Sequence, residues 1–144
     1  MCVIGLWSRT ELRDVACILG HELYRRFPEL LAAVSPTDPG LPYAVMIEFV
    51  HWLSKQGRPG DSPELVRRVT EFHDWCMEQP PGADASDDTL TIVVVGLYET
   101  IITMEGARPW ITCLISKEEL LDIRDGLIPW VGQRAFDLAL AAYD

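Results

Sequence analysis

The sequence lacks the features of a secreted or membrane-spanning protein. Its apolar stretches, such as residues 92–97, fall far short of the ~20 residues that cross a bilayer as a helix. The first seven residues are apolar but lack the basic start and the small-residue cleavage site of a signal peptide. The cysteines, which show no paired spacing, are Cys2, Cys17, Cys76 and Cys113. We therefore expect free thiols and a reducing, cytoplasmic environment.

Basic residues are also scarce. The chain has 12 Lys and Arg against 22 Asp and Glu, which gives a formal net charge of -10 at pH 7. A nucleic-acid-binding protein needs a basic footprint to meet the phosphates, and anionic membrane surfaces attract basic segments. The charge balance therefore predicts that neither nucleic acid nor a membrane is a partner.

No residue pattern identifies a reaction. The sequence contains no Gly-x-Ser-x-Gly nucleophile motif, no glycine-rich phosphate loop and no cysteine in a recognisable catalytic context. We therefore expect a protein that is not an enzyme and that needs no cofactor.

Two short patterns contain metal-ligand residue types, but each is incomplete. Glu48 and His51 form a Glu-x-x-His pair, the half-motif of di-iron bundles, and the sequence has no second copy. His73 and Cys76 lie one helical turn apart, but a zinc site needs two more ligands. Since Cys76 also falls on an apolar stripe, a buried thiol near a boundary histidine is the favoured interpretation. We predict no bound metal.

The apolar content is sufficient for a core. Apolar residues make up 49% of the 144 residues, as in globular proteins, and no linker divides the chain, so residues 1–144 are expected to form one domain. Apolar residues recur mostly at helical spacing, which predicts an all-α bundle of five or six helices. The expected helices cover residues 8–27, 43–56, 61–79, 89–104, 116–126 and 131–143, with a short helical turn at 28–34.

Local signals mark three of the helix starts. A Ser or Asp precedes a Glu by three residues, the spacing at which the two side chains cap each other's backbone amides. The pairs are Ser8 with Glu11, Asp61 with Glu64, and Ser116 with Glu119.

The segment Thr89–Val95 is open to two interpretations. It is rich in β-branched residues, which favour a strand. However, Leu90, Val94 and Leu97 begin an apolar pattern with the period of a helix that continues to residue 104. We therefore predict a helix.

The net negative charge is confined to one part of the chain. Residues 1–60 contain six basic and six acidic residues, whereas residues 61–144 contain six basic and 16 acidic residues. An acidic surface would speed the encounter with a basic protein. The candidate partner-binding residues, which include two tryptophans near the acidic segments, are Glu64, Glu71, Asp74, Trp75, Glu78, Asp84, Asp87, Asp88 and Trp110.

A structural explanation exists for each of these features. The acidic residues can form a solvated face, and helical spacing allows two local ion pairs, Glu64 with Arg68 and Arg67 with Glu71. Tryptophans at helix entries, as expected for Trp110 and Trp130, either anchor an interface or fill gaps between helix ends.

The order of the motifs resembles one group of proteins. Residues 27–30, Phe-Pro-Glu-Leu, follow the first expected helix, and Leu-Tyr-Glu at residues 97–99 lies near the middle of the 89–104 helix. In this order, residues 20–105 resemble the small acidic helical immunity proteins of bacterial contact-dependent or secreted toxin systems. The resemblance implies a cytoplasmic protein that binds and blocks a cognate toxin domain, and it implies no catalytic residues.

We therefore expect an immunity-type inhibitor that occludes the active site of a toxin with a basic surface. The acidic helix 61–79 and the segment 84–88 would face the toxin's substrate cleft, with carboxylates in place of substrate phosphates. The alternatives are a helical adaptor or regulatory module that binds another protein and, third, an enzyme of unknown reaction.

Overall fold

All regular secondary structure in the described part of the chain is helical. The computed structural model describes residues 9–33, 40–83 and 88–144, with side chains from residue 18 to residue 32 in the first range and throughout the other two. These ranges contain nine α-helical segments and no strand. The all-α class is therefore confirmed for the described residues, but the expected number of five or six helices is wrong.

The nine α-helices are α1 (Arg9–Arg26), α2 (Glu29–Ala33), α3 (Pro42–Ser54), α4 (Pro63–Met77), α5 (Thr89–Ile92), α6 (Glu99–Thr103), α7 (Lys117–Asp122), α8 (Arg124–Val131) and α9 (Gln133–Ala141). Between them lie two 3-10 helices, η1 (Pro59–Asp61) and η3 (Arg108–Cys113), and one π-helix, η2 (Val93–Tyr98).

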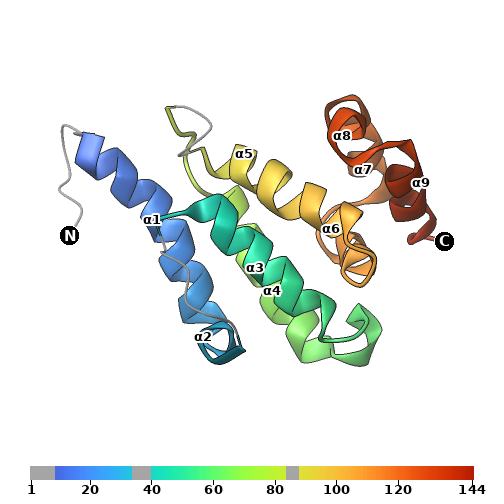
Figure 1. The fold of residues 1–144 in the computed structure, drawn as a ribbon, viewed down its shortest axis with the longest axis horizontal. Helices are drawn as coiled ribbons and strands as arrows, with labels where there is room; N and C mark the ends of the chain where they lie inside the picture. Colours follow the sequence, from blue (N-terminus) through green and yellow to red (C-terminus); the bar gives the residue numbers. More distant parts are fainter. Residues whose placement is uncertain (1–8, 34–39, 84–87) are drawn as a thin grey trace.

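The longer helices build the body of the molecule, and the short C-terminal helices close one end of it. α1 packs against α3 and α4, and α3 packs against η2. Figure 1 shows α7, α8 and α9 together at the far end from α1, where α8 and α9 contact α6. These three short helices replace the two that we expected over residues 116–143. The boundary between α8 and α9 is Gly132, whose positive φ of 87° ends a right-handed helix.

The segment Thr89–Val95 is helical, as predicted. α5, η2 and α6 follow one another without a break, and η2 widens the helix by one π-helical turn. Gly96 in this turn lies against α3, and a Cβ atom at this position would be only 3.2 Å from the Cβ of Met46. The β-branched residues of this segment favour a strand, but the helix buries one face against α3. The apolar residues recur with the period of a helix, so only the helical conformation places them together on that buried face.

An aromatic cluster joins three helices at the centre of the core. The ring of Phe27, which follows α1, lies 4.8 Å from that of Phe49 on α3 and 6.2 Å from that of Phe72 on α4. All three side chains are fully buried. Rings at these separations with tilted planes attract one another in addition to their hydrophobic burial. This cluster fixes how α4 sits against α1 and α3.

Helix capping follows the sequence prediction at one of the three starts and differs at another. Ser116 and Glu119 form the expected reciprocal cap of α7. At α4, however, the cap is Ser62, whose hydroxyl accepts a hydrogen bond from the Leu65 amide, and Asp61 belongs to the preceding turn, where its carboxylate accepts from the Arg58 amide. The third predicted pair includes Ser8, which lies outside the described residues.

The two tryptophans expected at helix entries have different environments. Trp110 is completely buried in η3, and its indole Nε1 donates a hydrogen bond to the Gly57 carbonyl at 3.1 Å. Trp130, in contrast, lies near the C-terminal end of α8, and 76% of this residue is exposed. Trp110 lies in the first turn of η3, so its predicted place at a helix entry is confirmed, but its side chain is buried. Trp130 is the second-last residue of α8, so its predicted place at a helix entry is wrong. None of the helices in the described ranges is long and apolar enough to span a lipid bilayer.

Candidate functional site

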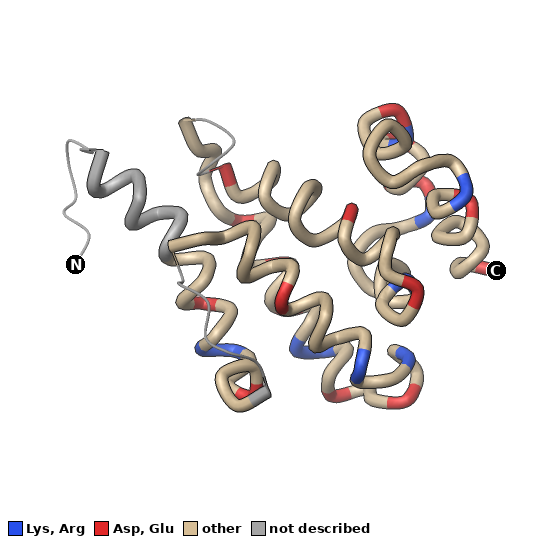
Figure 2. The backbone as a smooth tube through the Cα atoms, in the orientation of Figure 1, with Lys and Arg blue, Asp and Glu red and all other residues tan. Residues whose placement is uncertain are grey.

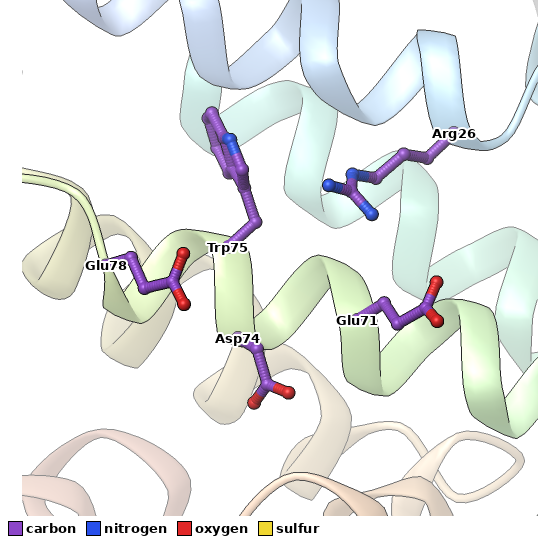
Figure 3. A pocket seen from close by; sticks show the side chains of 5 residues that line it. All are labelled: Arg26, Glu71, Asp74, Trp75 and Glu78. Atoms are coloured by element: carbon purple, nitrogen blue, oxygen red, sulfur yellow. The ribbon is translucent and has the colours of Figure 1, made fainter.

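Four of the nine predicted partner-binding residues line one hollow on the surface of α4. The hollow has a volume of about 350 Å³, and its lining residues are Arg26, Glu71, Asp74, Trp75 and Glu78. The last four lie at i, i+3, i+4 and i+7, so a helix places them on one face. Figure 3 shows them along α4, with Arg26 entering from the end of α1. The helical spacing in the sequence therefore led to a set of residues that the structure brings together.

The carboxylates of α4 differ in how far they are neutralised. Arg67 binds Glu64 and Glu71 on the same face of the helix, with its Nη1 at 2.7 Å from Glu71 Oε1. No ion pair joins Asp74 or Glu78 to any part of the chain that the structure describes, and both residues are exposed. The negative charge of the hollow is therefore concentrated in the last turn and a half of α4.

One predicted ion pair is wrong. We expected Glu64 to bind Arg68, but Arg68 reaches away from the α4 surface and binds Glu29 through both carboxylate oxygens at 2.7 Å. The guanidinium of Arg68 lies 4.7 Å above the ring of Phe27. The position beside Glu29 is more favourable for Arg68 than the pair with Glu64, because it provides two hydrogen bonds to one carboxylate and a cation–π contact with Phe27.

The position of the hollow along α4 adds to its negative potential. In Figure 2 the blue segments of the first half of the chain that the figure colours lie along the lower edge, around the C-terminal ends of α1 and α3 and the first turns of α4. The hollow lies toward the other end of α4, where Glu78 is the C-cap residue. The unpaired carbonyls of a helix C-terminus carry partial negative charge, which favours cations. The helix C-terminus and the carboxylates of Asp74 and Glu78 therefore both favour cations, while the charge of Arg26 opposes them in part.

Trp75 and Arg26 form the inner wall of the hollow. Trp75 is half-buried, and its ring stacks on that of Phe72 at 6.2 Å with an angle of 13° between the planes. In Figure 3 its indole points toward α1 while the carboxylates line the outer side. Arg26 Nε donates to Glu22 at 3.3 Å, so its charge is partly balanced within α1. The hollow therefore offers an aromatic surface between carboxylates.

The other predicted residues do not join the hollow. Glu64 lies in the first turn of α4, beyond the lining residues. Asp84 and Asp87 lie outside the described residues. Asp88 caps α5, where its carboxylate accepts hydrogen bonds from the Thr91 amide and hydroxyl and from the Gly82 amide. These bonds lower the pKa of Asp88. Its oxygens are therefore engaged in local structure rather than offered to a partner.

The prediction that Trp110 contacts a partner is wrong. Its side chain is buried on all sides and its one hydrogen-bond donor is used within the chain, so it presents nothing to a partner. Arg26, in contrast, was not predicted as a site residue. No sequence signal could have found it, because it comes within reach of α4 only through the packing of α1 on that helix.

None of the histidine and cysteine side chains that the structure describes lines the hollow. His73 is 7% exposed, so it is buried rather than at a boundary, and Cys76 is 1% exposed. Burial raises the pKa of the Cys76 thiol to about 12. His51 is exposed on α3, and the Tyr24 hydroxyl donates to Glu48 at 3.4 Å. Within the described ranges, no three His, Cys, Asp or Glu side chains come close enough together to hold a metal ion.

The comparisons with known proteins identify no relative. No protein-family model matches the chain, and neither a curated protein nor a solved structure matches it. The resemblance to immunity proteins therefore stays a prediction, and the function must be argued from the hollow itself.

Proposed function

We propose that this protein binds a basic protein through the hollow on α4, and that the partner is a toxin domain whose active site it occludes. The observation that carries the proposal is the pair of exposed carboxylates, Asp74 and Glu78, beside the half-buried ring of Trp75. Neither carboxylate has an ion-pair partner within the described residues. Inhibition would be steric and electrostatic and would involve no chemistry by this chain.

The physical basis is the match between this surface and a cationic one. Unpaired carboxylates at a helix C-terminus attract Lys and Arg side chains, and this attraction accelerates encounter more than it strengthens the final complex. Aromatic side chains in partly desolvated positions supply much of the binding energy in protein interfaces. A toxin that acts on nucleic acids or nucleotides has a basic substrate cleft, so carboxylates can occupy the positions of its substrate's phosphates.

The partner and the surface can be tested together. The tagged chain is used as bait in a lysate of its native cell, and captured proteins are identified by mass spectrometry. The double variant Asp74→Lys, Glu78→Lys should lose the captured protein. A matched control, Asp125→Lys with Asp137→Lys, makes the same charge change at exposed positions on α8 and α9 and should retain it.

The identity of the captured protein decides the second half of the proposal. Expression of the captured domain should arrest growth of a host cell, and co-expression of this chain should restore growth. Capture of a non-toxic protein would favour the adaptor alternative. Equal loss of capture in both double variants would show that overall charge, and not the α4 hollow, controls binding.

Kinetics separate the roles of the carboxylates and the tryptophan. The Asp74→Lys, Glu78→Lys variant should slow association and reduce its salt dependence. Trp75→Ala should mainly speed dissociation, with a loss of about 2 kcal/mol or more in binding free energy. Circular dichroism of each variant must first show an intact fold, because Trp75 also stacks on Phe72.

A further inference from the structure

His73 is a buried titratable residue that the proposed binding surface does not use. It lies on α4, next to Asp74 in the sequence, and is 7% exposed. Its ring Nε2 lies 2.5 Å from the hydroxyl oxygen of Tyr98, which is 4% exposed and is the last residue of η2. One hydrogen bond between two buried side chains thus joins α4 to the helix formed by α5, η2 and α6.

This hydrogen bond can take up the phenolic proton of Tyr98 only when the imidazole is neutral. A neutral ring whose own proton is on Nδ1 accepts the Tyr98 hydroxyl proton at Nε2, so that proton has its acceptor. A protonated ring is a donor at both nitrogens, so the Tyr98 hydroxyl becomes the acceptor and its proton must find another partner. A buried hydroxyl without an acceptor is unfavourable, and so is a charge in a buried position.

The neighbouring ionisable groups act against one another. Burial lowers the pKa of His73 from its ordinary value of 6.5, while the carboxylates of Asp74 on α4 and Glu119 on α7 act to raise it. Burial raises the pKa of Tyr98, and Cys76, Glu119 and Tyr143 act in the same direction. Burial has the largest effect on His73, so the neutral ring is the form that the folded chain favours.

We propose that the His73–Tyr98 contact is an acid-sensitive joint, in which protonation of His73 loosens the packing of α4 on the helix that contains η2. The joint concerns the free chain, so it stands whether or not the α4 hollow binds a toxin. Because His73 precedes Asp74 and Trp75, loosening of this joint also displaces the residues that line the hollow.

The sign of the pH dependence follows from the lowered pKa. The unfolded chain binds a proton at His73 at a higher pH than the folded chain does. The stability that the neutral ring contributes is therefore complete above pH 6.5 and is lost as the pH falls through the folded-state pKa. Between pH 6.5 and the folded-state pKa of His73, unfolding takes up as much as one extra proton. The unfolding equilibrium constant therefore rises by up to about tenfold for each unit by which the pH falls.

The first experiment compares urea unfolding at pH 7.0 and pH 5.5 in three proteins: the wild type, His73→Gln and His51→Gln. Glutamine keeps a donor and an acceptor for Tyr98 but does not titrate, and His51 is an exposed matched control on α3. The wild type and His51→Gln should lose stability on acidification, and His73→Gln should lose clearly less. Glu99, whose pKa burial raises, has the opposite sign and cancels in the comparison. An equal loss in all three proteins would overturn the proposal.

A second measurement needs no variant, so it holds even where His73→Gln fails to fold. NMR can follow the ring protons of the three histidines of the wild type as the pH is lowered. The ring of His73 should titrate below its ordinary value of 6.5, because burial lowers its pKa. Amide protection should fall first in α4 and η2 as His73 titrates. Titration of His73 at or above pH 6.5, or unchanged protection in both segments, would contradict the joint.

Discussion

Two adjacent arginines on α4 provide a sharp test of which contacts hold this bundle together. Arg67 and Arg68 both bind glutamates, but their partners lie in different places. Arg67 binds Glu64 and Glu71 on the exposed surface of its own helix. Arg68 binds Glu29, which begins α2, and so ties α4 to the corner between α1 and α2. We expect Arg68→Ala to destabilise the fold and Arg67→Ala to leave its stability within experimental error.

The expected loss for Arg68→Ala is the sum of three contacts. The fork to Glu29 is partly exposed, with 25% and 41% of the two side chains accessible, so we take about 1 kcal/mol for it, the upper end of the range for surface pairs. The bond from Nη2 to the Arg26 carbonyl, 2.6 Å long, contributes about 1 kcal/mol, and the stacking on Phe27 about 0.5 kcal/mol. The total is about 2.5 kcal/mol, and Arg68→Lys should lose roughly half of it because lysine has no planar fork.

Urea unfolding followed by circular dichroism measures these differences. Arg68→Ala should lower the midpoint of unfolding without a change in slope, and its melting temperature should fall by roughly 5–10 °C. Arg67→Ala is the control for the loss of one positive charge from α4. Equal destabilisation by the two alanine variants would refute the reasoning, and so would full stability of Arg68→Lys, because either result would make net charge more important than geometry.

Two further predictions concern Asp88 and Trp110, which we expected on the binding surface and which instead stabilise the fold. Asp88→Ala should cost about 1–2 kcal/mol of stability at pH 7, the usual effect of an N-cap. Because hydrogen bonding lowers the pKa of Asp88 below 3.8, this cost should hold above that pH and disappear in more acidic urea titrations. Trp110→Phe should cost about 1–3 kcal/mol, since it leaves the Gly57 carbonyl without its indole donor. The rate constants for partner binding by the Trp110→Phe variant should be unchanged, in contrast to those of Trp75→Ala.

The local features of this fold were predictable from the sequence. The capping pair at Ser116 and the helical period through Thr89–Val95 depend on residues within one or two turns of each other, so a pattern in the sequence contains the necessary information. The same holds for the exposed stripe of Glu71, Asp74 and Glu78, because a single helix sets their spacing.

The number of helices was not predictable in the same way. A periodic pattern continues through a π-helical turn or across a single residue such as Gly132, while the backbone does not continue as one α-helix. At the break between α8 and α9, Gly132 takes a positive φ, and the two short helices then pack against α6 and each other. Periodicity shows which residues are buried on a helix, but not where a chain bends to bury them.

Sequence by itself determined the helical class of the described residues, the confinement of excess negative charge to residues 61–144, and the helix face that carries it. Only the tertiary structure decided that Arg68 binds Glu29, that Trp110 is buried, that His73 meets Tyr98, and that Arg26 completes the hollow. In each of these cases the partners come from separate segments of the chain. Their meeting depends on the packing of whole helices, and the free energy of a long-range contact can exceed that of the local pair that the sequence suggests.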